Sequence, residues 1–162
     1  MSVSEPRDER WLTFEVGGQP FALPILDVFE VTEVGRIGPV PSLPRALGGV
    51  MHYHGDALPI VSPSALLDVA VEEGAVPEHV VVVASDGGDT PRLGLPVGRV
   101  LGLVNAPPPA TRQPEPVTAR LPVDGRVIGI LDAQHLCDRA AELVARSAEH
   151  GSNDSEQWGE TT

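Results

Sequence analysis

Short apolar runs separated by glycine, proline and aspartate make up most of this chain. Several of the runs alternate apolar and polar residues, which is the pattern of a strand with one buried face. Roughly ten such runs follow one another, with turn residues at about the 8–12-residue spacing that small sandwiches and barrels show. The pattern therefore predicts an all-β fold in which one chain builds two small barrels.

The segment 40–61 carries the densest signal, because two apolar runs there are joined by a glycine turn. Its first run, 50–54, alternates and places His52 and His54 on one face, with the intervening tyrosine and the preceding methionine on the other. We expect a turn at 55–56, followed by a return strand. The segment therefore predicts a β-hairpin, and the function depends on what this hairpin presents to other molecules.

The other elements are predicted from patterns of the same kind. Residues 25–31 are expected to form a turn that enters a strand, since they combine a leading proline with β-branched residues. One helical turn is expected at 62–67, and Asp132 is expected to cap a helix over 133–146, whose apolar residues recur at helical spacing. Further strands are expected over 11–16, 21–24, 79–84, 92–97, 100–104, 118–122 and 126–131.

An acidic loop over 68–78 separates two sets of about five strands, and this spacing divides the chain. The last residues are polar and have no hydrophobic periodicity, which is typical of disorder. We therefore expect a flexible lead over 1–10, a first barrel over about 11–67, a second barrel over about 78–131, a C-terminal helix over about 132–146 and a disordered tail over 147–162.

The charge of the chain narrows the choice of partners. It carries 23 acidic residues against 11 basic ones, a formal net charge of −12, and every base is an arginine. Such a charge repels nucleic acid and anionic lipid, so neither is expected as a partner. The single cysteine, Cys137, excludes an internal disulfide and suits a reducing cytoplasm.

The chain shows no targeting or membrane segment. Its first ten residues are polar and charged, without the apolar core of a signal peptide. No apolar run approaches the ~20 residues that a membrane-spanning helix needs. We therefore expect a cytoplasmic protein without direct membrane insertion.

Metal binding and catalysis are the two kinds of chemistry that the side chains could carry. His52 and His54, with Asp56 nearby, are candidate metal ligands, because two histidines on one strand face can chelate an ion. The alternative is that they are polar side chains on an outward face. No serine lies in a Gly-x-Ser-x-Gly elbow, and a chain without lysine has no Walker-type phosphate loop. The sequence therefore predicts no catalytic group and no cofactor.

Taken in order over residues 11–146, these motifs resemble the CheW-like domain, the adaptor fold of bacterial chemosensory systems. The resemblance rests on the order and spacing of many patterns, each of which is unspecific by itself. They are FEVGGQPFALPI at 14–25, VFEV at 28–31, the V-P-x-x-P and hydrophobic-G-V entry at 40–50, LPIV at 58–61, HVVVVA at 79–84, GLPV at 94–97, RVLGLV at 99–104 and DGRVIGILD at 124–132.

The resemblance implies a fold of two intertwined five-stranded SH3-like β-barrels with a C-terminal α-helix, and no enzymatic activity. It also implies an adaptor that couples the cytoplasmic tips of methyl-accepting chemoreceptors to the regulatory domain of a CheA-type histidine kinase. Such an adaptor would join the membrane only through receptor complexes. The pathway would be flagellar chemotaxis or, for a divergent member, a non-flagellar one. The alternative function is a histidine-based metal-binding or small-ligand-binding β protein.

The resemblance also implies which residues bind partners. Where the family has an N-x-R-G motif with a functional arginine, this chain has His52-Tyr53-His54-Gly55, so His54 replaces the arginine. We expect His54 to lie within about two strand spacings, ~10 Å, of Glu30. A histidine would then form a weaker pair with the carboxylate than an arginine fork does. The implied partner-binding set is Val28, Phe29, Glu30, Gly49, Val50, Tyr53, His54 and Gly55.

Overall fold

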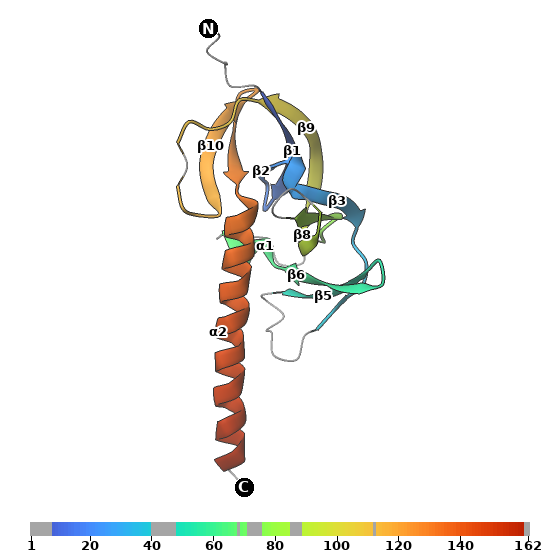
Figure 1. The fold of residues 1–162 in the computed structure, drawn as a ribbon, viewed down its shortest axis with the longest axis vertical. Coiled ribbons are helices and arrows are strands. Elements are labelled where there is room, and N and C mark those ends of the chain that lie inside the picture. The colour runs from blue at the N-terminus through green and yellow to red at the C-terminus, as the bar shows by residue number, and fades with distance from the viewer. Residues whose placement is uncertain are drawn as a thin grey trace.

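The structure is a computed structural model that describes residues 8–39, 48–67, 69–70, 76–84, 89–111 and 113–160. Residues 1–7 of the expected flexible lead and the first residues of the 40–61 segment lie outside the described residues, whereas Glu9 and Arg10 already belong to the first strand. The strands form two sheets, and a long helix ends the chain (Figure 1). The all-β class with a C-terminal helix is therefore confirmed.

The first sheet has five strands in the order β10-β11-β2-β1-β9. It is strongly curved, with β9 and β10 at its two edges (Figure 1). Its strands combine the N-terminal hairpin with the last part of the chain. Their bounds are β1 Glu9–Val16, β2 Gln19–Pro24, β9 Arg99–Ala106, β10 Val117–Val123 and β11 Arg126–Leu131.

The second sheet has six strands in the order β3-β7-β8-β6-β5-β4. The short helix η1, Ile25–Asp27, connects the first sheet to β3, and α1, Pro63–Leu67, follows β6 within the second sheet. The strand β4 was missed in the sequence, because two residues are too few for an alternating pattern. The bounds are β3 Val28–Glu33, β4 Ile37–Gly38, β5 Gly48–Tyr53, β6 Asp56–Val61, β7 His79–Ala84 and β8 Pro91–Val97.

The expected division into one barrel over 11–67 and another over 78–131 is wrong. The N-terminal hairpin pairs with β9 on one side and with β11 on the other, while β7 and β8 pair with β3 and β6. Each sheet thus contains strands from both halves of the chain, as expected of two intertwined units. The spacing of apolar residues locates each strand, but it does not reveal which distant strands pair with one another. The expected barrel boundaries therefore followed the order of the strands along the chain.

Three apolar clusters hold the sheets together. One lies inside the first sheet around Trp11 and Ile130, and another lies inside the second sheet around Met51 and Val80. The largest cluster joins β1, β2, β7 and β8 to both α-helices, and Leu136 of the final helix is fully buried in it. Each sheet therefore has its own small core, and the shared core fixes one sheet against the other.

The final helix, α2, spans Ala133–Glu160 and begins as expected, since Asp132 Oδ1 accepts a hydrogen bond from the His135 backbone N–H at 3.0 Å. The expected end at Arg146 and the expected disordered tail from 147 differ from the structure, in which the helix continues away from the sheets (Figure 1). No proline follows Asp132, so no residue forbids the extension, and each glycine costs only about 1 kcal/mol. Among the described helices, none is both long and apolar enough to cross a membrane.

Candidate functional site

The hairpin of β5 and β6 is built around a two-residue turn at His54 and Gly55. Tyr53 pairs with Asp56, and both turn residues have positive φ angles, 46° for His54 and 84° for Gly55. These are the backbone angles of a type I′ turn, whose twist matches that of the flanking strands. The expected turn at 55–56 is therefore wrong by one residue, because His54 itself occupies the left-handed conformation.

Alternation in β5 separates an inner face from an outer one, as predicted. Met51 and Tyr53 are buried in the core of the second sheet, whereas His52 is exposed. The buried face continues on β6 through Leu58 and Ile60. The tyrosine is therefore the last core residue of the strand, and its hydroxyl reaches the boundary between core and solvent.

Glu30 of β3 joins this hairpin through its carboxylate. The Tyr53 hydroxyl donates a hydrogen bond to Glu30 Oε2, and His54 Nε2 lies 3.2 Å from the same oxygen. The Glu30 side chain is 42% exposed and that of His54 is 69% exposed. The expected proximity of Glu30 and His54 is confirmed.

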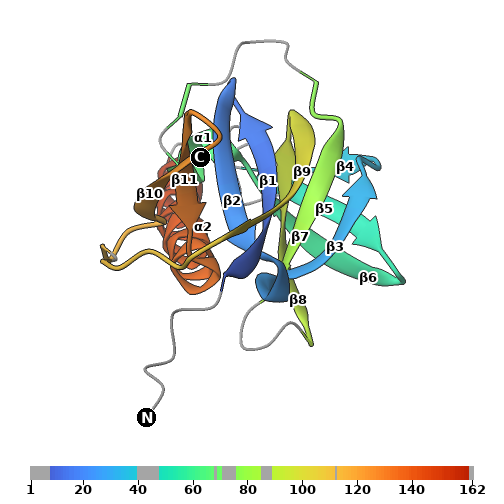
Figure 2. The same ribbon diagram turned by 90° about the horizontal axis from the view of Figure 1, so that it is seen from above.

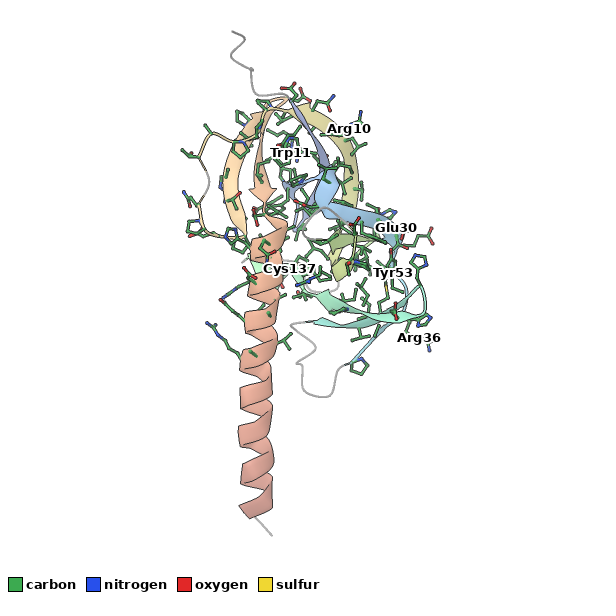
Figure 3. All side chains as sticks on the ribbon, viewed as in Figure 1. Arg10, Trp11, Glu30, Arg36, Tyr53 and Cys137 are labelled. Atoms are coloured by element: carbon green, nitrogen blue, oxygen red, sulfur yellow. The ribbon has the colours of Figure 1, made fainter. Side chains whose placement is uncertain are left out.

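The contact of Glu30 with Tyr53 and His54 joins two strands that are far apart in the pairing order of the second sheet. β3 forms one edge of the sheet, and β5 lies next to β4 at the other edge, so β7, β8 and β6 stand between the two strands in the order of pairing. Only a strongly curled sheet lets side chains of β3 and β5 meet. Figure 3 shows Glu30 and Tyr53 on the same side of the molecule, away from α2. The site therefore closes one end of the curled sheet.

The hydrogen bonds change the ionisation of both partners. Burial, followed by the hydrogen bond to Glu30 and its negative charge, raises the pKa of Tyr53 to about 12. The hydrogen bonds from Tyr53 and then from His54 hold the pKa of Glu30 below its ordinary value. The arrangement therefore keeps the tyrosine protonated and the carboxylate ionised at neutral pH.

Aromatic rings surround the carboxylate. The Phe29 ring lies 6.3 Å from that of Tyr53 at an interplanar angle of 79°, and the His54 ring lies 4.2 Å from it. Phe29 is 40% exposed, so part of its ring is accessible from solvent. The site thus combines a fixed negative charge with accessible apolar surface.

The remaining residues of the implied set have other positions. Val28 is half-buried and packs against the largest core cluster. Gly49 is buried, and a Cβ there would lie 2.4 Å from the Gly38 carbonyl oxygen, so its absence of a side chain lets β4 approach β5. Val50 is half-buried and shares the strand face of His52, opposite Tyr53. Of the eight residues, hydrogen bonds and ring contacts join Phe29, Glu30, Tyr53 and His54 into one cluster.

The metal alternative is not supported by the geometry. Among the described residues, no three histidine, cysteine, aspartate or glutamate side chains lie together in a way that fits one ion. His54 belongs to the turn and contacts Glu30, so it does not share a regular strand face with His52. The His52, His54 and Asp56 hypothesis failed because a period-2 pattern does not extend into a turn.

One part of the site was missed in the sequence. Tyr53 was expected near Glu30, but its hydroxyl was not assigned as a donor to the carboxylate. The available signal was its inward position on β5 next to the turn, since a buried tyrosine hydroxyl normally finds a partner. Which acceptor it finds depends on the curl of the sheet, which local pattern does not reveal.

The sequence is similar to a known protein family and to a curated protein. The family model described as CheW-like domain matches residues 10–141. Chemotaxis protein CheW of Rhizobium meliloti (strain 1021) is 37% identical over 73 residues, which cover 45% of this chain and 46% of that protein. The chain is thus aligned to less than half the length of this curated relative.

One solved structure has a similar fold. The crystal structure of scaffolding protein TtCheW from Thermoanaerobacter tengcongensis matches with a TM-score of 0.65 at 19% identity, covering 77% of this chain and 89% of that one. At this identity the likeness concerns the fold. Because the family model covers most of the sequence, the chain belongs to the CheW-like domain family.

Proposed function

We propose that this protein is a non-catalytic adaptor of a bacterial chemosensory complex. It couples the cytoplasmic tips of methyl-accepting chemoreceptors to the regulatory domain of a CheA-type histidine kinase. The observation that carries the proposal is the CheW-like match over residues 10–141, on a chain whose described residues gather no metal-binding cluster. The protein acts in the cytoplasm and reaches the membrane through its receptors.

The Glu30 site supports a role in binding. An adaptor works through surface, and a stable contact needs about 800 Å² on each partner, with a few apolar or aromatic anchors inside a polar rim. Phe29 and Ile37 are large apolar residues that remain 40% and 38% exposed. Phe29 lies in the same cluster as Glu30 and His54 and supplies an apolar anchor beside polar groups, and Ile37 is a further exposed apolar residue of the second sheet.

Histidine stands at position 54, where the family has an arginine, and this difference supports the proposal that the protein is a divergent member of the family. An arginine carries a permanent charge and a rigid fork, whereas histidine is charged only when protonated. His54 still contacts Glu30, at 3.2 Å, but it contributes a positive charge to the pair only when it is protonated. We assign the protein to a pathway with its own matched partners, flagellar or non-flagellar.

The test is direct binding with purified partners. The kinase regulatory domain and a soluble receptor-tip fragment, both encoded in the same genome, are titrated with the full chain by calorimetry. Micromolar binding to both is expected, and absence of binding to either partner would overturn the proposal.

The contribution of His54 is measured in the same titrations. His54→Ala is expected to weaken binding by up to about fivefold, since an exposed pair contributes ~0–1 kcal/mol. His52→Ala, on the outer face of the same hairpin, is the matched control. Equal affinities for wild type and His54→Ala at both pH 6 and pH 8 would remove His54 from the proposed interface.

A further inference from the structure

Glu30 receives both of its internal hydrogen bonds on one carboxylate oxygen. The Tyr53 hydroxyl and His54 Nε2 both reach Oε2. Within the described part of the chain, no hydrogen bond or ion pair reaches the second oxygen, Oε1. Since an ionised carboxylate accepts hydrogen bonds on both oxygens, Oε1 is available, as far as the described residues go, to a further donor.

The carboxylate is also held in place before any partner arrives. Tyr53 is only 7% exposed, and its ring is fixed in the core of the second sheet, so its hydroxyl is a rigid donor. Lost freedom of a side chain is one of the costs of association, and a side chain that is already ordered avoids part of it. Glu30 is therefore preorganised to accept a further hydrogen bond.

A bulge in β3 brings apolar surface to the same place. The pairing of β3 with β7 shifts between Val28 and Glu30, so that Phe29 is an extra residue in its strand. Such a bulge changes the direction of neighbouring side chains, which otherwise point to opposite faces. Phe29 and Glu30 accordingly both contact Tyr53, although they are consecutive in the chain.

An accessible aromatic ring beside an ionised carboxylate fits one kind of side chain. Arginine and lysine have an aliphatic stem that lies along apolar surface and a charged end that donates hydrogen bonds to a carboxylate. Their charged ends are also attracted to the faces of aromatic rings. A neutral donor would hydrogen-bond Oε1 more weakly and leave its charge uncompensated, and an acidic side chain would be repelled by it.

We infer that Glu30 Oε1 binds a cationic side chain of a partner protein, with Phe29 covering its stem and with Tyr53 as the positioning residue that holds the carboxylate. The inference rests on the proposed function, because the partner is taken to be the kinase regulatory domain or the receptor tip. It adds to that function the chemistry that the partner must present at this site.

The experiment compares two substitutions on one strand. Glu30→Gln removes the charge at the site, and Glu33→Gln removes the same charge from an exposed position three residues further along β3. Affinities for the two purified partners are measured by calorimetry at low and high salt. Glu30→Gln is expected to weaken binding about tenfold or more and to reduce its salt dependence, whereas Glu33→Gln leaves both nearly unchanged.

The partner cation is then identified by substitution of its exposed arginines and lysines with alanine. One of these changes is expected to weaken binding about as much as Glu30→Gln and to add nothing in combination with it, as a double-mutant cycle shows for groups in contact. Tyr53→Phe, which keeps the buried ring, is expected to give a smaller loss and to reduce the coupling measured in that cycle.

The outcomes distinguish failure of the inference about Glu30 from failure of the proposed adaptor function. If wild type binds and Glu30→Gln behaves like Glu33→Gln, or if no partner cation couples to Glu30, the inference is overturned and the adaptor function stands. If wild type binds neither partner, the adaptor function is overturned and the inference falls with it. Coupling of Glu30 to a single partner cation, reduced by Tyr53→Phe, supports both.

Discussion

Two hairpins of this molecule have the same backbone turn and very different surroundings. The turn at His54 and Gly55 has φ angles of 46° and 84°, and the turn at Asp124 and Gly125 has φ angles of 49° and 78°. Aspartate followed by glycine is a preferred sequence for such a turn, and histidine is, like aspartate, enriched among the non-glycine residues with positive φ. The two hairpins therefore solve the same geometric problem with different residues.

The difference lies in what precedes and contacts each turn. Tyr53 enters the first turn from the core and hydrogen-bonds Glu30, and His54 contacts the same carboxylate. Val123 enters the second turn half-buried, and Val127 beyond it is 58% exposed. The first hairpin is thus tied to β3 by hydrogen bonds from its last core residue and its turn, while the second reaches β1 only through the ion pair of Arg126 with Glu15, at 3.7 Å, among the described side chains of its turn. The comparison indicates that the side chains, and not the backbone turn, distinguish the two hairpins.

The largest expected effect comes from truncating the residue before each turn. Tyr53→Ala removes a buried aromatic ring and is expected to lower the free energy of unfolding by about 3–5 kcal/mol. Val123→Ala removes two methyl groups from a half-buried position and is expected to cost about 1 kcal/mol. Urea denaturation of both variants measures the difference. Similar losses in the two variants would show that the hairpins are equally anchored.

A smaller effect is expected at alkaline pH. The pKa of Tyr53 is about 12 in the folded protein, against an ordinary value near 10, so its stabilising contribution is complete below about pH 10 and is lost as the pH rises toward 12. Tyr53→Phe is expected to lack this loss. The chain has no lysine and a single tyrosine, so few other groups titrate in this range.

Absorbance of the single tyrosine near 295 nm reports its ionisation directly. In Glu30→Gln, the pKa of Tyr53 is expected to fall from about 12 toward its ordinary value, although burial still raises it. Glu15→Gln, on the first sheet, serves as the control. An unchanged titration in Glu30→Gln would show that the carboxylate does not hold the hydroxyl.

The smallest difference in stability between the two hairpins is expected from substitution of the glycine that each turn contains. Gly55→Ala and Gly125→Ala each place a Cβ in the left-handed conformation, which costs about 1–2 kcal/mol, and in both turns the new atom meets open space. The two losses of unfolding free energy should therefore agree within about 0.5 kcal/mol. A much larger loss for Gly55→Ala would mean that the first turn is held by more than its backbone.

Much of the molecule was predictable from patterns within single segments. Period-2 alternation identified the buried face of β5, and a continuous apolar run identified β7 as fully buried. Asp132 marked the start of α2, and the motif order marked Glu30 and His54 as neighbours. The buried faces and the start of the helix follow from the residues of a single segment. The proximity of Glu30 and His54 was predicted from the family resemblance, which supplies the long-range pairing.

The position of the first turn was not predictable in this way. Histidine-glycine at 54–55 and glycine-aspartate at 55–56 are both compatible with a two-residue hairpin. Moving the turn by one residue shifts the pairing by two, so the same side chains still face the core. Strand alternation therefore does not distinguish the two turns, and the structure adopts the one in which His54 and Tyr53 share Glu30.

By itself the sequence determined the strands, the buried faces and the start of the final helix, because these follow from the spacing of apolar residues along a single segment. Only the tertiary structure decided that β1 and β2 join β9 and β11, and that β3 curls round to meet β5 (Figure 2). These contacts join residues far apart in the chain. Their free energy comes from packing and hydrogen bonds that no segment makes alone, so the acceptor that Tyr53 finds is a property of the whole fold.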